Sequence, residues 1–428
     1  MSTFSKVSQL STILFIILII LAIAAQKPAY AQINSTPLTS QANSPDRKAD
    51  STVKEIDAID LARKVFRIKT PAKDSVKYVP GKVYVSAIPG VGYAILTGFT
   101  AVTTGNFAFY TGSSTNENIS AIQANLEYSQ NNQFIPYIIS NIWTKDNKYN
   151  ILGDYRYFKY SMYTYGLGGN SPTDNPDYFY YNFVRIYQMV LKQVFPDLLI
   201  GPGYNLDYHW DIAEDPAFAN LIPKSENDYY RYGSPSTTIS SGLSVNLLYD
   251  TRRNQINPIG GSSYVNVIFR DNFQFMGSDQ NWSSLYADFR KYIEWPRGSK
   301  NILALWNYEW LTTSGKPPYF DLPSTGWDTY QNAGREYIQG RYRGLDYLYM
   351  EAEYRFNISR NRMFGAAFFA NIESASDWPS NSFKTFVPGG GATLRIKVNK
   401  HSDTFFVVGY GWGVNGQSGL CFNLGEYF

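Results

Sequence analysis

Hydrophobic and polar side chains alternate along most of the chain from residue 82 to residue 428. In the segment 346–357, for example, Leu348, Met350 and Phe356 fall on one parity, and Glu351 and Glu353 fall on the other. Because successive side chains of a strand point to opposite faces, this two-residue period predicts a strand with one apolar and one polar face. We count sixteen such candidates, which begin near residues 83, 98, 118, 133, 149, 177, 198, 237, 261, 280, 301, 346, 364, 383, 404 and 419.

The C-terminus shows the same alternation and stops on an aromatic residue. The apolar positions that share one parity there are Leu420, Phe422, Leu424 and Phe428. A final strand that pairs with the first strand would leave no sheet edge open to lipid. With the strand count, this pattern predicts an all-β fold, namely a transmembrane antiparallel β-barrel of about sixteen strands.

A soluble β-sandwich or propeller is the alternative all-β fold. No repeat of blade length is visible, and the strand candidates are long for a sandwich. Aromatic residues make up 17% of the chain, with 36 Tyr, 27 Phe and 9 Trp. Tyr and Trp suit the interfaces of a bilayer, where one end of the side chain is wet. The composition therefore favours the membrane barrel.

The first 31 residues predict an export signal. Lys6 supplies a positive start, residues 13–25 form an uncharged apolar run, and residues 29–31 form a small-x-small cleavage site. A single membrane-spanning helix is the alternative, but the apolar run is short for one.

Residues 32–81 are polar and are expected to form a periplasmic N-terminal segment ahead of a barrel at 82–428. Apolar residues between Glu55 and Phe66 have near-helical spacing, which predicts a short amphipathic helix. A solvated linker is the alternative for this stretch.

The sequence offers little for catalysis or for metal binding. The chain has two histidines and one cysteine, Cys421, which cannot form a dedicated zinc site or an internal disulfide. No nucleophile stands with a base in a recognisable arrangement. We therefore expect no enzymatic activity, no metal and no cofactor. The net charge of +3, without a basic cluster, gives no indication of a nucleic-acid partner.

Four stretches form a recognisable series. The first is a strand-turn-strand motif, whose characteristic residues are Tyr249, Asp250, Arg252, Pro258 and Gly260. The second lies in the long connection before the twelfth strand candidate, and its characteristic residues are Arg335, Tyr337, Gly340, Arg341 and Arg343. The third is the twelfth strand candidate itself, at 352–356, and the fourth is the C-terminal stretch 419–428.

In this order, the four stretches resemble the BamA/TamA superfamily of outer-membrane barrels, also called bacterial surface antigens. The resemblance covers residues 83–428. It implies a sixteen-stranded barrel whose sixth external loop, before strand twelve, folds back into the lumen. It also implies that Arg335 anchors this loop.

The parity of the twelfth strand predicts a partner for the loop independently of the resemblance. Glu351 and Glu353 lie on the face opposite Leu348 and Met350, and hence in the lumen. An arginine that reaches them would make charge-assisted hydrogen bonds and hold the loop inside the barrel as a plug. The alternative is a solvated loop face, on which exposed ion pairs contribute about 0–1 kcal/mol.

Two positions depart from the family pattern. Glu336 stands where the family usually has Gly, which questions how tightly the loop tip can turn. Asn371 stands where the family has an Asp on the next strand. This second anchor is expected to be neutral and weaker, so that the plug depends mainly on Glu353.

The resemblance implies a non-enzymatic protein of the cell outer membrane that assists the insertion or translocation of polypeptide, or of lipid. The expected partners are outer-membrane lipid and lipopolysaccharide, and the outer-membrane assembly machinery during biogenesis. Classical members carry polypeptide-transport-associated (POTRA) modules, for which residues 32–81 are too few. A barrel-only member that works with a separate periplasmic subunit is therefore expected. The alternative function is a passive outer-membrane pore or a structural surface antigen.

Overall fold

The computed structural model describes residues 55–66, 81–94, 96–112, 117–171, 176–219, 221–400 and 402–428. The predicted export signal lies outside the described residues. So does most of the polar segment 32–81, apart from the stretch that contains one helix, α2 (Ala58–Phe66). This helix falls within the range expected from the spacing of apolar residues.

Sixteen strands form one antiparallel sheet in which each strand pairs with its neighbours in sequence, from β1 to β16. The strands are β1 (Tyr84–Ala94), β2 (Gly98–Phe109), β3 (Ser120–Ser129), β4 (Tyr137–Trp143), β5 (Tyr149–Thr164), β6 (Asp177–Phe195), β7 (Leu198–Glu214), β8 (Thr238–Asp250), β9 (Ser263–Asn272), β10 (Trp282–Glu294), β11 (Ile302–Gly315), β12 (Tyr347–Asn357), β13 (Phe364–Ala375), β14 (Val387–Asn399), β15 (Thr404–Trp412) and β16 (Ser418–Leu424). The predicted all-β barrel fold and its strand number are confirmed.

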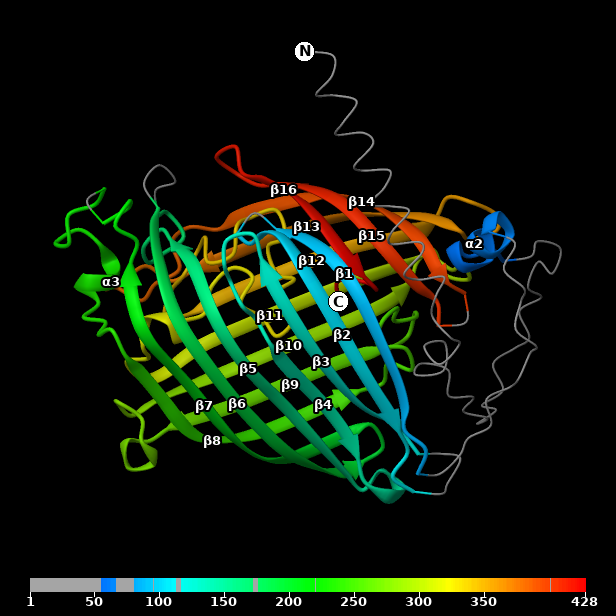
Figure 1. Ribbon diagram of the computed structural model, residues 1–428, viewed down its shortest axis with the longest axis horizontal. Coiled ribbons are helices and arrows are strands. Elements are labelled where there is room, and N and C mark those ends of the chain that lie inside the picture. Colours follow the sequence, from blue (N-terminus) through cyan, green and yellow to red (C-terminus); the bar gives the residue numbers. More distant parts are fainter. Residues whose placement is uncertain are drawn as a thin grey trace, which may run out of the picture.

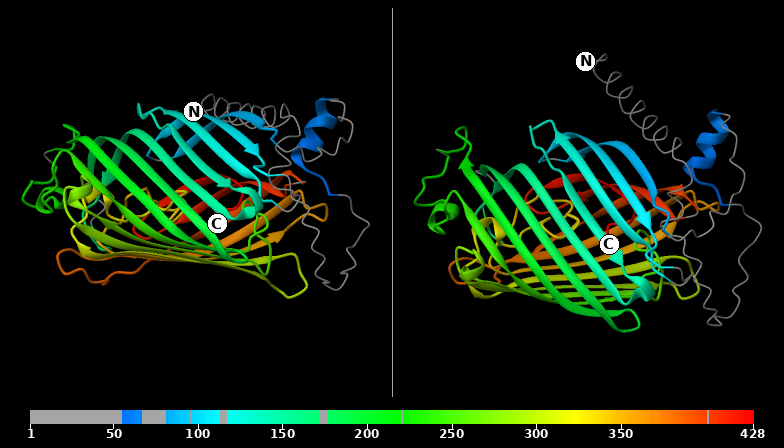
Figure 2. Two further views of the ribbon diagram at one scale, coloured as in Figure 1. Left: turned by 90° about the horizontal axis from the view of Figure 1, so that it is seen from below. Right: turned by 60° about the horizontal axis from the view of Figure 1, so that its bottom comes forward.

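The sheet curls into a barrel that encloses a lumen (Figures 1 and 2). The edge strands β1 and β16 lie beside each other. The described strand pairs join β1 to β16 in order and include no ladder between these two edges. The barrel wall therefore has one seam that differs from its fifteen regular strand pairs.

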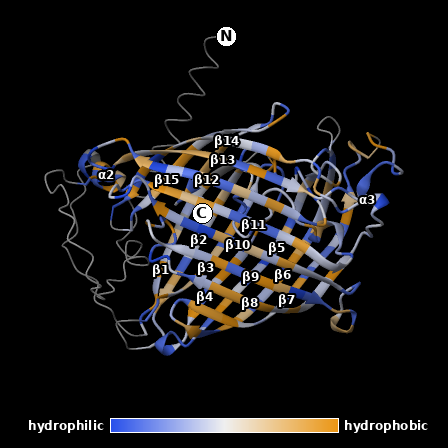
Figure 3. Ribbon diagram, turned by 180° about the vertical axis from the view of Figure 1, so that it is seen from behind, coloured by the Kyte–Doolittle hydropathy of each residue, from blue (hydrophilic) through white to orange (hydrophobic). Residues whose placement is uncertain are grey.

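The two faces of the wall follow the alternation in the sequence. On β12, Tyr349, Glu351 and Glu353 are buried in the lumen, while Met350 and Ala352 are exposed on the outer face. Hydrophobic and hydrophilic positions alternate along the strands around the wall (Figure 3). This is the pattern of a wall that presents apolar side chains to lipid and polar side chains to its interior.

The two described α-helices lie at opposite ends of the barrel (Figure 1). One end carries α2 and the turns β12–β13 and β14–β15, and the other carries α3 (Asp228–Arg231). No helix in the described part of the chain has both the length and the apolar character needed to cross a bilayer. Short 3-10 turns occur at η2 (Lys145–Asn147), η3 (Gln274–Met276) and η4 (Tyr319–Asp321).

The connection between β11 and β12, residues 316–346, folds into the lumen (Figure 2). We call it loop six. Most of its residues are buried, including the continuous stretch 319–328. The in-folded loop that the sequence predicted before strand twelve is therefore confirmed.

The prediction for Phe428 is wrong. β16 ends at Leu424, and Gly425, with φ of +106°, turns the chain inward. Leu420, Phe422 and Leu424 are exposed on the outer face, whereas Phe428 is 3% exposed and packs inside the barrel against Trp306. The parity rule fails there because a positive φ at glycine breaks the two-residue period.

Candidate functional site in the barrel lumen

The tip of loop six is a tight turn. The Tyr337 backbone N–H donates a hydrogen bond to the Gly334 carbonyl at 2.8 Å. Gly334 has φ of +66°, and a Cβ there would lie 2.6 Å from Cγ2 of Thr325. Any other residue at this position would strain the backbone and would collide with the Thr325 side chain. The turn presents Arg335 and Glu336 to the wall formed by β12–β15.

Arg335 joins two carboxylates of β12. Its Nη2 donates to Glu353 Oε2 at 2.8 Å and also contacts Glu351 Oε1. The guanidinium lies between two aromatic rings, 3.8 Å from the ring centre of Phe369 and 4.0 Å from that of Tyr427. All three charged side chains are almost fully buried. Arg335, Glu351 and Glu353, which sequence reasoning proposed as partners, thus meet in one place.

The charges continue as an alternating chain beyond Arg335. Glu353 Oε1 accepts from Arg355 Nε at 2.6 Å, and Arg355 Nε lies 3.5 Å from Glu426 Oε2. The Glu426 carboxylate also accepts from Arg395 of β14, at 3.0 Å from Nε. Three arginines and three glutamates therefore balance one another, and we call these six residues the arginine network. Removing one member would leave buried charge without a partner, which is costly.

Glu336 and Asn371, the two residues that depart from the family pattern, contact each other. Asn371 Nδ2 donates to Glu336 Oε2 at 3.1 Å. Burial raises the pKa of the Glu336 carboxyl. The turn closes with Glu336 in place because the wall opposite is glycine: a Cβ at Gly389 or Gly411 would collide with the Glu336 side chain. The resembled family has its carboxylate on β13, whereas this chain carries a carboxylate on the loop and an amide on β13.

Tyr337 extends the same contact along the glycine-lined wall. A Cβ at Gly413 would lie 2.3 Å from the Tyr337 ring. The Tyr337 hydroxyl donates to the Pro388 carbonyl at 2.7 Å and accepts from the Val414 N–H at 3.0 Å. The glycines of β14 and β15 therefore form a groove that receives the loop tip. Sequence reasoning missed this groove, which the alternate spacing of Gly409, Gly411 and Gly413 could have indicated.

Arg341 and Arg343 are held differently from Arg335. Arg341 donates to the Ser171 side chain and carbonyl, both at 2.8 Å. Arg343 is fully buried and donates to the carbonyls of Tyr319 and Leu322 at 3.1 and 3.2 Å. Neither forms an ion pair within the described part of the chain. They fix the loop to itself and to the segment after β5.

Gly340 lies between the loop tip, which contacts β12–β15, and the arginines Arg341 and Arg343. Its φ is +80°, and a Cβ would lie 2.9 Å from the Tyr163 carbonyl of β5. The Gly168 N–H donates to the Arg343 carbonyl at 2.7 Å. The backbone of loop six therefore lies directly against β5 and its following loop.

Sequence reasoning missed a further anchor at η4. The Asp321 carboxylate accepts from Ser240 Oγ of β8 at 2.5 Å and lies 3.6 Å from His209 Nδ1 of β7. Burial raises the pKa of Asp321 to about 7. No motif marks this residue, and only the folded loop brings it to the wall.

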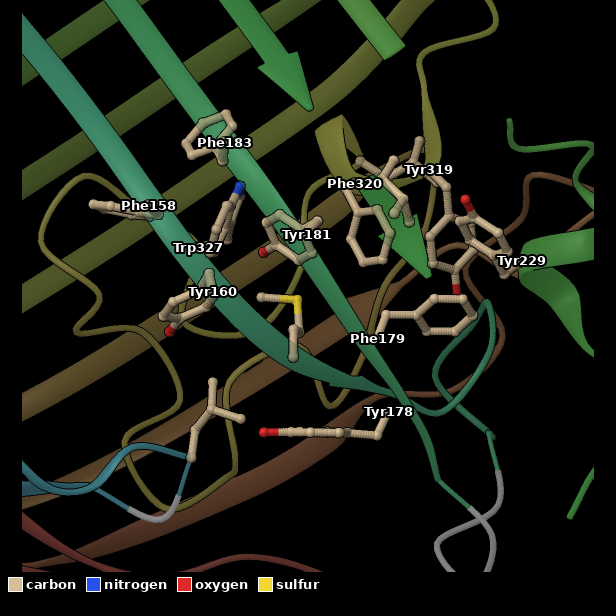
Figure 4. Close-up of a cluster of buried hydrophobic side chains, with 14 of the residues drawn as sticks. Phe158, Tyr160, Tyr178, Phe179, Tyr181, Phe183, Tyr229, Tyr319, Phe320 and Trp327 are labelled. Carbon is tan, nitrogen blue, oxygen red and sulfur yellow. The ribbon is translucent and has the colours of Figure 1, made fainter. Parts of the chain in front are cut away.

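Around η4 the lumen is filled by aromatic side chains (Figure 4). They come from β5 and β6, from α3 and from loop six. The ten residues that form this aromatic cluster are Phe158, Tyr160, Tyr178, Phe179, Tyr181, Phe183, Tyr229, Tyr319, Phe320 and Trp327. Phe320 packs on both Phe179 and Tyr181, with ring centres 5.9 and 4.8 Å apart. Loop six is therefore bound to this wall by apolar contact.

The strand-turn-strand motif lies at the end of the barrel that carries α2. Tyr249 is on the outer face of β8. Asp250 and Arg252 form a bidentate pair, with both distances 2.9 Å. The turn follows Pro258, and a Cβ at Gly260 would lie 2.8 Å from Glu294 Cβ.

The same turn reaches the other end of the chain. The Ile256 carbonyl accepts from the Glu426 N–H at 2.8 Å. Asn254 donates to the Ser402 carbonyl at 2.9 Å, and Asn257 donates to Asp403 Oδ2 at 2.9 Å. The motif therefore binds the β14–β15 turn and the C-terminal tail, and through Glu426 it adjoins the arginine network.

The site contains charge but no arrangement of metal ligands. Among the described residues, no group of three or more His, Cys, Asp or Glu side chains could hold a metal ion. The geometry positions and holds loop six inside the barrel. Its chemistry is that of ion pairing and close packing.

The structure resembles outer-membrane barrels of known structure. BamA from Haemophilus ducreyi lacking POTRA domains 1–3 matches with a TM-score of 0.52 and 12% identity, over 86% of this chain and 76% of that chain. The chain has the fold of the BamA/TamA-type barrels. CdiB from Acinetobacter baumannii matches with a TM-score of 0.52 and 11% identity, over 80% of this chain and 60% of that chain.

A second CdiB shares this BamA/TamA-type fold. CdiB from Escherichia coli matches with a TM-score of 0.51 and 11% identity, over 82% of this chain and 62% of that chain. This chain thus spans less than two thirds of either CdiB chain. No protein-family model and no curated protein sequence matches the chain. The likeness is one of fold.

Proposed function

We propose that this chain is an outer-membrane barrel that assists the insertion or translocation of polypeptide through the seam between β1 and β16. The observation that carries the proposal is a wall with one seam around a lumen that loop six fills. A closed lumen directs any opening to the seam, because β1 and β16 need not break a regular ladder to separate. The BamA and CdiB likeness supports the same assignment.

In this proposal the end of the barrel that carries α2 and the C-terminal tail faces the periplasm. The arginine network and the aromatic cluster keep loop six in the lumen while the seam moves. The reaction needs no covalent step. The expected partners are outer-membrane lipid and lipopolysaccharide, the assembly machinery, and a separate periplasmic subunit in place of POTRA modules.

Site-specific photocrosslinking tests the route of the polypeptide. A crosslinking amino acid is placed at Val91 on β1 or at Leu420 on β16, and an equally exposed control is placed at Val245 on β8; the three are 50%, 55% and 63% exposed. An unfolded outer-membrane protein is then added to the barrel in liposomes. Crosslinks at the two seam positions, and not at Val245, are expected. Equal crosslinking at all three positions would contradict a seam route.

A passive pore is the second candidate, and the filled lumen weighs against it. Loop six contacts β5, β8, β12 and β13 across the lumen, which favours a plugged barrel over the wide aqueous passage of a porin. The structural surface antigen remains as a function without transport. Polypeptide crosslinking at the seam distinguishes it from the first proposal.

A further inference from the structure

A cavity of about 350 Å³ opens at the end of the barrel that carries α2. We call it the basic vestibule, because five of its lining side chains are cationic and two are acidic. The cationic side chains are Lys300, Arg355, Arg362, Arg395 and Lys397. The cavity adjoins the arginine network, because Arg355 and Arg395 belong to both.

Arg355 forms part of the buried inner side of the vestibule. The residue is 1% exposed, and its Nε and Nη2 are used by Glu353 and by the Phe428 carbonyl at 2.6 and 3.0 Å. Its Nη1 has no hydrogen-bond partner among the described residues.

The carboxylates of the N-terminal stretch already lie on the rim of this cavity. Glu55 forms ion pairs with Arg362 and with Lys397, the latter at 3.7 Å. Asp60 pairs with Lys400, which follows β14. The members of the Glu55–Arg362 and Asp60–Lys400 pairs are 21–35% exposed. Partly exposed pairs of this kind are weak enough to exchange.

The rim also contacts the peptide backbone of the same stretch. The Ile56 N–H donates to the Asn361 carbonyl at 3.3 Å. The Lys400 N–H donates to Asp57 Oδ2 at 2.8 Å. Hydrogen bonds to a main-chain N–H, together with carboxylate contacts, are features of polypeptide recognition. A phosphate group could accept from the Lys400 N–H, but it has no donor for the Asn361 carbonyl, which accepts from a main-chain N–H here.

We infer that the basic vestibule binds an acidic segment of a polypeptide, and that the stretch 55–60 occupies its rim in this structure. The inference rests on the proposed function for the source of that polypeptide, which would reach the vestibule from the periplasm. The occupant is a partner segment rich in Asp and Glu. The chain's own stretch 55–60 shows this charge complementarity, because its carboxylates pair with the cationic side chains at the rim.

Peptide binding to the purified full-length barrel in detergent tests the inference. The probe is a fluorescent peptide that copies residues 51–66 of this chain, measured by anisotropy. The full chain carrying Glu55→Gln, Asp57→Asn and Asp60→Asn should bind the probe about tenfold more tightly than the unsubstituted chain, the change expected when the two partly exposed ion pairs are lost and the charge on the Asp57 hydrogen bond is removed. Adding Arg362→Gln and Lys400→Gln should abolish the gain.

The controls distinguish recognition of an acidic polypeptide from non-specific adsorption and from lipid binding. A probe with its Asp and Glu replaced by Asn and Gln must not bind, and each barrel variant must keep its heat-modifiable mobility, which shows that it is folded. Equal binding of the neutral probe, or binding that ignores Arg362 and Lys400, would overturn the inference. Displacement of the acidic probe by phosphatidylglycerol, with no displacement by the unlabelled peptide, would also overturn it and assign the site to lipid.

The result is independent of the proposed function. Peptide binding without seam crosslinks would support the basic vestibule as a peptide-binding site and would contradict the seam route. Seam crosslinks without peptide binding would do the reverse.

Discussion

Loop six contacts two walls of the barrel whose chemistry is opposite. Toward β5 and β6 it packs against the aromatic cluster, in which Phe320 and Trp327 meet rings from the wall. Toward β12–β14 its tip enters the arginine network, whose six members are joined to one another by ion pairs and charge-assisted hydrogen bonds. One loop is thus held on one side by burial and on the other by charge.

The two contacts differ in what they require. The free energy of apolar burial is largely non-directional, so it depends less on the exact position of the loop than an ion pair does. A buried ion network tolerates no missing partner, because an isolated buried charge is strongly unfavourable. We infer that the arginine network determines the register of the loop tip, while the aromatic cluster supplies apolar stabilisation.

The largest effect is expected from Arg335→Ala. The substitution leaves Glu351 and Glu353 buried without their shared cation, which should destabilise the barrel by about 4 kcal/mol. Thermal unfolding in detergent, followed by heat-modifiable mobility, measures it. Adding Glu351→Gln should restore part of the loss. An unchanged unfolding temperature for Arg335→Ala would mean that the network does not hold the loop.

Phe320→Ala tests the aromatic wall and should cost about 3 kcal/mol, through lost burial and the cavity that remains. The same unfolding assay applies. Its loss should add to that of Arg335→Ala, because the two residues share no partner. Strong non-additivity would show that the two walls are coupled and do not hold the loop independently.

Asp321→Asn should change the dependence of stability on pH. Because the pKa of Asp321 is raised from its ordinary value of 3.8 to about 7, the docked loop retains a proton that the released loop loses. The stability of docking is therefore full below about pH 4 and falls as the pH rises to about 7. The variant should be more stable than the parent at pH 8 by at least about 1.4 kcal/mol, the value of one pKa unit. Parallel pH profiles for the two proteins would reject this role.

The smallest effect is expected from the pair formed by Glu336 and Asn371. Asn371→Asp places two carboxylates together and should destabilise the barrel by about 1 kcal/mol. The exchanged variant, Glu336→Gln with Asn371→Asp, restores one carboxylate and one amide and should recover most of that loss. If the exchange is as unstable as Asn371→Asp alone, the hydrogen bond does not compensate for the departures from the family pattern.

Alternation alone predicted the wall accurately. The expected starts of β5, β6, β7, β13 and β15 coincide with those observed, and the lumen face of Glu351 and Glu353 follows from parity. β4 begins at Tyr137 rather than near 133, because Phe134 forms only isolated bridges. Strand periodicity is a local property, so local sequence is sufficient to reveal it.

The interior was less predictable, because its partners are distant in sequence. Arg343 is held by backbone carbonyls, which carry no residue signature, and Asp321 meets Ser240 only after the loop folds. The inward turn of Phe428 depends on a single positive φ at Gly425. Such contacts are set by tertiary structure, and no pattern along the chain encodes them.

The central claim is that loop six, anchored at Arg335, closes the lumen. Conductance of the purified barrel in a planar bilayer tests it most directly, with the unsubstituted chain and Arg335→Ala compared under the same conditions. We predict small, flickering currents for the unsubstituted chain and larger, longer openings for Arg335→Ala. Large, steady currents that do not depend on Arg335 would contradict the claim and identify a passive pore.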